Sequence, residues 1–72
     1  MNEMMTEFER LRIKAGLSIA QVCEEAKISR STVEKIEKNL PVRAHLASRA
    51  CNVLSRYLGQ DIDFTSIGIP TV

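Results

Sequence analysis

Three helix-start signals, spaced eleven or twelve residues apart, divide the first half of this sequence. Thr6 is followed three residues later by Glu9, a pattern typical of a capping box at a helix N-terminus. Ser18 and Gln21 repeat that spacing, and Ser29 is a third residue of the type preferred at an N-cap. The chain is therefore expected to begin as a series of short helices.

The bounds of these helices follow from apolar spacing and from the residues that end a helix. The first is expected from Thr6 to Gly16, the second from about Ile19 to Glu25 and the third from Ser29 to about Lys38. Only residues 26–28 separate the second helix from the third, a turn that suits two helices crossing sharply. On the third helix Val33, Ile36 and Leu40 form one apolar stripe, and the opposite face is polar.

The second half of the chain predicts one longer helix and a tail. Pro41 cannot continue a helix, and apolar residues then recur at helical spacing up to Gly59, which predicts a fourth helix over about residues 43–58. Residues 60–72 are rich in β-branched side chains interrupted by Gly and Pro, which is typical of an extended arm. We expect an all-α domain over residues 1–59 and a C-terminal arm over residues 60–72 that can serve in dimerisation.

Composition excludes several classes of protein. The 72 residues suffice for one small domain, and no run of about 18 apolar residues exists to span a membrane. With 44% apolar and 26% charged residues and a net charge of +1, the chain does not have the composition of a disordered segment. The acidic N-terminus does not resemble a secretory signal, so a cytoplasmic location is expected.

Neither a metal site nor an active site is visible in the sequence. Cys23 and Cys51 are isolated and His45 is the single histidine, so the ligands of a structural zinc site are lacking and no cofactor is expected. Both cysteines have small apolar neighbours, which favours reduced core residues over a disulfide. No nucleophile stands with a base, and the chain has little volume for a small-molecule pocket, so no enzyme is predicted.

Several segments together resemble a known family. They are Arg12–Ser18, Ala20–Cys23, Ile28–Ser29 and Thr32–Glu37. In sequence they resemble the helix-turn-helix of the phage Cro and repressor family, also called XRE-like. The resemblance covers about residues 8–58 and implies a compact lambda-repressor-like domain of four to five helices that binds double-stranded DNA. The third helix is then the recognition helix, which lies in the major groove.

The polar face of the third helix supplies the candidate base-reading residues. Arg30 and Lys35 can donate to guanine, Glu34 can accept from cytosine, and Ser31 can do either. By resemblance these four residues lie at the family's base-reading positions. A solvated helix face without DNA contacts is the alternative.

Phosphate contacts require backbone amides at helix starts and cations nearby. The candidates are Ser18, Ile19, Ser29, Lys38 and Arg43. Ile19 and Lys27 depart from the family, which often has a polar residue and a glycine at these positions. Lys27 in a left-handed conformation would cost on the order of 1 kcal/mol without removing the fold. His45 can touch a phosphate or be an ordinary surface residue.

Arg12 and Glu37 resemble the family's ion pair between the first and third helices, which would brace the recognition helix. The alternative is two exposed charges worth under about 1 kcal/mol.

The near-neutral total hides an uneven distribution of charge. Residues 10–59 hold all ten basic residues and four glutamates, a net charge of +6, and both ends of the chain are acidic. Selective binding in this family usually comes from two-fold dimers, so we expect a homodimer on an inverted repeat. The candidate interface residues are Leu54, Tyr57, Leu58, Ile62 and Phe64. The arm can pair across the two-fold axis or pack back on its own domain.

Two classes of function follow. The first is a Cro-like, repressor-like or controller-like transcriptional regulator of phage or mobile-element type; if it also activates, Glu24 and Glu25 could contact RNA polymerase. The second is an antitoxin or other protein-interaction module whose arm binds a partner protein.

Overall fold

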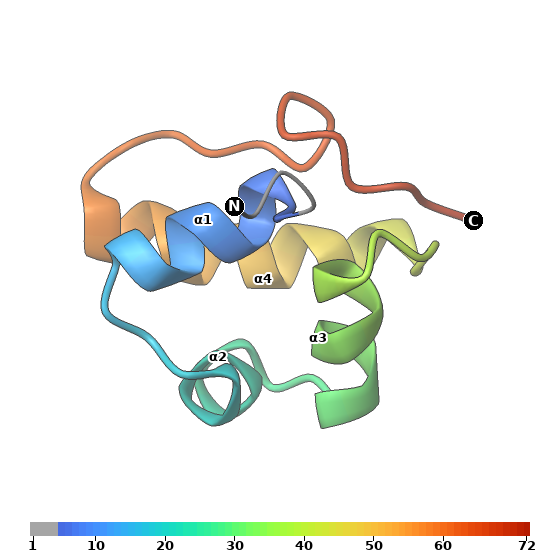
Figure 1. Ribbon diagram of the computed structural model, residues 1–72, viewed down its shortest axis with the longest axis horizontal. Coiled ribbons are helices and arrows are strands. Elements are labelled where there is room, and N and C mark those ends of the chain that lie inside the picture. The colour runs from blue at the N-terminus through green and yellow to red at the C-terminus, as the bar shows by residue number, and fades with distance from the viewer. Residues whose placement is uncertain (1–4) are drawn as a thin grey trace.

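The computed structural model describes residues 5–72, which contain four helices and no strand. The helices are α1 (Glu7–Lys14), α2 (Ile19–Ala26), α3 (Arg30–Glu37) and α4 (Ala44–Leu58). In Figure 1, α1 and α4 run across the domain, and α2 and α3 lie together on one side of them. The expectation of an all-α fold is confirmed, and the helix bounds differ from those expected by one or two residues.

Polar side chains start the first three helices as expected. The Thr6 hydroxyl accepts from the Glu9 backbone N–H at 3.1 Å, and the Ser29 hydroxyl accepts from that of Thr32 at 3.2 Å. At Ser18 the full capping box is present, because the Gln21 side chain also accepts from the Ser18 backbone N–H at 2.8 Å. Each cap satisfies amides that the helix leaves unpaired, typically worth about 1 kcal/mol.

The turn between α2 and α3 contains a strained residue. Lys27 lies in the left-handed region, with φ 60° and ψ 46°, and its N–H donates to the Cys23 carbonyl. The Arg49 guanidinium on α4 donates to the Lys27 carbonyl at 3.3 Å, which helps hold the turn. A conformation that costs a non-glycine residue about 1 kcal/mol is thus kept so that α2 and α3 can cross at close range.

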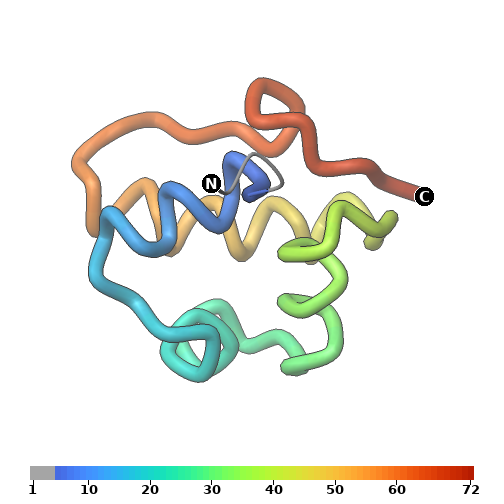
Figure 2. The backbone as a smooth tube through the Cα atoms, in the orientation of Figure 1, coloured from blue at the N-terminus to red at the C-terminus, as the bar shows by residue number. Residues whose placement is uncertain are grey.

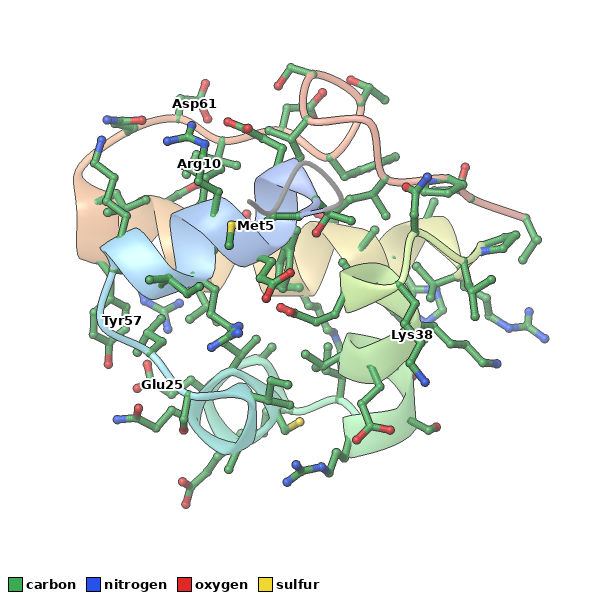
Figure 3. All side chains as sticks on the ribbon, viewed as in Figure 1. Met5, Arg10, Glu25, Lys38, Tyr57 and Asp61 are labelled. Carbon is green, nitrogen blue, oxygen red and sulfur yellow. The ribbon has the colours of Figure 1, made fainter. Side chains whose placement is uncertain are left out.

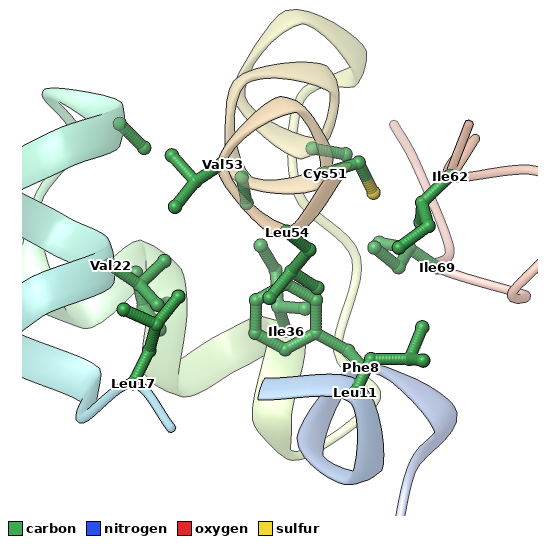
Figure 4. Packing of buried hydrophobic residues seen from close by; sticks show 14 of the residues in the cluster. Phe8, Leu11, Leu17, Val22, Ile36, Cys51, Val53, Leu54, Ile62 and Ile69 are labelled. Atoms are coloured by element: carbon green, nitrogen blue, oxygen red, sulfur yellow. The ribbon is translucent and has the colours of Figure 1, made fainter. Parts of the chain in front are cut away.

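All four helices and the tail contribute to one hydrophobic core (Figure 4). Phe8 of α1, Val22 of α2, Ile36 of α3 and Leu54 of α4 are each at most 1% exposed. Cys51 is buried in the same cluster, and both cysteines are free thiols. The prediction of reduced cysteines is confirmed, and burial, with a smaller effect of the Asp63 charge, raises the pKa of Cys51 to about 12.

The C-terminal arm packs back on its own domain (Figure 2). It is not extended throughout: the Asp63 carbonyl accepts from the backbone N–H groups of Ser66 and Ile67, and Gly68 with φ 76° ends the turn. Ile62 and Ile69, on either side of this turn, are 8% and 7% exposed. The β-branched residues that suggested a strand therefore fill the core.

Two of the predicted interface residues belong to this core. Leu54 is fully buried and Ile62 nearly so, which leaves neither free to contact a partner in this conformation. Tyr57 is 48% exposed, and Leu58 and Phe64 are partly buried.

Candidate nucleic-acid interface

The third helix, α3, presents one apolar and one polar face. Val33 and Ile36 are at most 1% exposed and anchor the helix to the core. Ser31 and Lys38, two turns apart, are exposed on the opposite side. Figure 3 shows the Lys38 side chain projecting from α3 into solvent. The predicted stripe is wrong at Leu40, which is 46% exposed because Asn39, with φ 63°, turns the chain away after the helix ends.

The four candidate base-reading residues all lie on or beside this polar face. Arg30, Ser31 and Lys35 are exposed. The Glu34 carboxylate is 44% exposed and accepts from the Arg30 guanidinium at 3.0 Å. This pairing places a donor group beside an acceptor group at the start of the helix. The i, i+4 spacing of Arg30 and Glu34 is the feature of the sequence that could have indicated this pair.

The pair gains little from the helix itself. A cation is disfavoured near a helix N-terminus, and pairs with the acidic residue second are the weaker orientation. Arg30 is the first residue of α3 and precedes Glu34. The pair is therefore expected to add little to the stability of the helix.

The candidate phosphate-contacting residues offer different donor groups to a phosphate. The Ser18 and Ser29 hydroxyls accept backbone N–H bonds, and the amides that follow these two residues are free to donate to a phosphate. The Ile19 side chain packs against the core and can offer only its backbone N–H. Lys38 and Arg43 are exposed cations on either side of the loop between α3 and α4, and the Arg43 side chain makes no capping bond.

An ion pair joins α1 to the end of α3. The Arg12 Nε donates to Glu37 Oε2 at 2.8 Å, and a second guanidinium nitrogen is 3.4 Å from the other carboxylate oxygen. The two side chains are only 13% and 11% exposed. Arg12 Nη1 also donates to the Leu17 carbonyl at 2.8 Å. One guanidinium therefore ties together α1, the segment before α2, and α3.

Three contacts could not be found from the sequence. The Arg49 guanidinium donates to the Lys27 carbonyl. The Glu25 carboxylate of α2 accepts from the Tyr57 hydroxyl of α4, and the two side chains point toward one another in Figure 3. Loop residue Val42 pairs with the C-terminal segment. Each joins residues at least 22 positions apart, and no local pattern marks the partners.

Within residues 5–72 no group of three or more potential metal-binding side chains occurs, and no helix is long and apolar enough to cross a membrane. His45 is exposed beside Arg43 at the start of α4.

Comparisons with known proteins assign the family. Neither the curated proteins nor the solved structures gave a significant match. A family model described as a helix-turn-helix domain matches residues 3–61, most of the chain, and agrees with the positions of α2, α3 and the turn between them. Members of this family are typically DNA-binding and not enzymatic. The chain belongs to the helix-turn-helix domain family.

Proposed function

We propose that this protein is a sequence-specific transcriptional regulator that acts in the cytoplasm by binding an inverted-repeat operator as a homodimer. The observation that carries this proposal is the exposed polar face of α3, a helix that the largely buried Arg12–Glu37 pair ties to α1, with side chains 13% and 11% exposed. The net charge of +6 over residues 10–59 supplies the attraction to phosphate.

The roles of individual residues follow from their positions. Ser31, Lys35 and the Arg30–Glu34 pair meet base edges in the major groove. Lys38, Arg43 and the amides at the starts of α2 and α3 contact phosphates and set the position of α3 in the groove.

A single domain of this size reads few base pairs, so selectivity requires two copies. Tyr57 offers an exposed aromatic side chain at the end of α4, and Leu58 and Phe64 offer partly exposed apolar side chains. We place the dimer surface on these three residues. Leu54 and Ile62 stay in the core of their own chain.

A titration of fluorescent duplex DNA at several salt concentrations tests the DNA-binding role. Non-specific binders reach a Kd of about 10⁻⁴ to 10⁻⁶ M at physiological salt, and affinity rises as salt is lowered. We expect binding tighter than about 10⁻⁵ M near 50 mM salt, with a steep salt dependence. Weaker binding to every genomic upstream fragment would exclude the operator-binding role.

A further inference from the structure

The chain leaves α3 through a Schellman motif, which fixes the first residues of the loop that joins α3 to α4. The Leu40 backbone N–H donates to the Lys35 carbonyl at 2.8 Å, and the Asn39 N–H donates to the Ile36 carbonyl at 3.1 Å. Asn39, with φ 63°, supplies the left-handed residue that this motif requires. Two backbone bonds therefore hold Leu40 in a defined position relative to α3.

The next residues of the loop are fixed as well. Pro41 has a restricted φ and disfavours a helical conformation of Leu40 before it. Val42 is only 5% exposed, and its backbone N–H donates to the Pro70 carbonyl at 3.2 Å. Leu40 and Pro41 therefore form a short exposed tip between two anchored points.

Leu40 lacks the apolar neighbour that usually accompanies this motif. The residue at its position frequently packs against an apolar side chain three or four residues before the C-cap. In this chain the C-cap is Lys38, and those two positions hold Lys35 and Glu34. The Leu40 side chain is 46% exposed. An apolar side chain on a well-defined backbone is thus available to a partner.

The surroundings of Leu40 are basic. Lys35, Lys38 and Arg43 are exposed, and within residues 5–72 none of them forms an ion pair. The sequence has no Asp or Glu over residues 38–60. In a two-fold contact between copies the same surface meets itself, so a contact at Leu40 would bring these cations together. The charge favours an anionic partner that also offers an apolar surface, and a DNA strand offers both in its phosphates and sugars.

We propose that Leu40 contacts the backbone of one DNA strand, with its side chain on a deoxyribose between phosphates that Lys38 and Arg43 bind. The inference rests on the proposed DNA-binding function and adds an apolar contact to the ionic ones. Because the Schellman motif joins Leu40 to α3, this contact positions α3 in the groove without reading a base.

Substitutions at Leu40 distinguish an apolar contact from an ionic one. In a titration of a fluorescent mixed-sequence duplex of about 30 bp, Leu40→Ala should weaken binding about three- to tenfold, the effect expected from burying half of a leucine side chain. The salt slope should not change, because an apolar contact releases no counterions, whereas Arg43→Ala should lower it by about one unit. Leu40→Met keeps the apolar surface and should bind within about twofold of the unaltered protein.

Ile13→Ala provides the matched control. Ile13 is also a branched aliphatic residue, 53% exposed, and lies near the end of α1, which Figure 1 shows on the opposite side of the domain from the α3–α4 loop. Its removal should change affinity less than about twofold. Both side chains are exposed, so neither alanine variant should lower the melting temperature by more than about 4 °C.

Three results would contradict this role. Equal affinities of Leu40→Ala and Ile13→Ala, while the unaltered protein binds DNA, would show that Leu40 does not touch the strand. A dimer that Leu40→Ala converts to monomer in light scattering would assign Leu40 to a contact between copies. A salt slope that falls with Leu40→Ala would show that the variant disturbs the ionic contacts instead. If the unaltered protein shows no salt-dependent binding, the proposed function itself is wrong, and this inference with it.

Discussion

The Arg12–Glu37 ion pair should be the strongest single polar contribution to this fold, and its removal makes a quantitative prediction. Arg12→Met keeps most of the aliphatic stem but removes both bonds to Glu37 and the bond to the Leu17 carbonyl. It leaves a carboxylate that is only 11% exposed without its cation. Exposed ion pairs are worth about 0 to 1 kcal/mol, and breaking a buried pair costs about 3 to 5 kcal/mol.

The exposures of 13% and 11% place this pair between those limits, so we expect a loss of about 2 to 3 kcal/mol. Domains under about 80 residues rarely have more than 3 to 5 kcal/mol of stability, so the loss is a large fraction of the total. The melting temperature should fall by roughly 10 to 20 °C. Urea denaturation followed by circular dichroism measures the change.

The Arg30–Glu34 pair provides an internal control. Its bond length is 3.0 Å, but its side chains are 64% and 44% exposed. A double-mutant cycle of Arg12→Met with Glu37→Gln should give a coupling free energy above about 1 kcal/mol, against below about 0.5 kcal/mol for Arg30→Met with Glu34→Gln. Equal coupling free energies for the two pairs would refute the idea that burial makes the brace strong.

Four further predictions concern the turn, the core, the groove and the dimer. Lys27→Gly should raise the free energy of unfolding by up to about 1 kcal/mol over Lys27→Ala, because only glycine adopts φ 60° without a steric cost; equal denaturation midpoints would contradict this. Burial raises the pKa of the Cys51 thiol to about 12 from 9.0, so the unfolded chain loses this proton first and stability should fall as pH rises from about 9 to 12. Cys51→Ala should lack that part of the alkaline loss in pH-dependent urea melts. Lys35→Ala should cost about 1 to 3 kcal/mol of binding and relax one base position, whereas Arg43→Ala should weaken binding to all sequences and lower the salt slope by about one unit; the same effect from both variants on selected and random duplexes would count against these roles. Tyr57→Lys should shift a dimer toward monomer in light scattering without lowering the melting temperature of the monomer, because the lysine cation can pair with Glu25 in place of the hydroxyl; an unchanged mass would place the interface elsewhere.

The local features of the fold could be predicted because neighbouring residues determine them. The hydroxyls of Thr6, Ser18 and Ser29 bond amides three residues ahead, so the caps depend on sequence spacing alone. The left-handed conformation of Asn39 follows in the same way from the end of α3, whereas that of Lys27 was suggested by the glycine that the resembled family commonly has there.

The remaining features depend on where distant segments meet. The tail has the composition of an extended strand. In the structure, a turn that begins at Asp63 brings Ile62 and Ile69 onto the domain, and both side chains are buried in the core. The same packing brings Val72 to Val42, across 30 positions of sequence. For the candidate DNA surface, the residue types and their helix could be predicted, and the i, i+4 spacing of Arg30 and Glu34 is compatible with their pairing. The bond from Arg12 to the Leu17 carbonyl required the structure.

Selection of duplexes from a random library, with sequencing of the bound fraction, tests the central claim most directly. We predict enrichment of an inverted repeat whose half-sites are centred about 34 Å apart, which is one turn of DNA. Arg30→Ala should change the preferred base within each half-site. A bound fraction with no enriched sequence, at protein concentrations that saturate the DNA, would contradict the claim that α3 reads an operator.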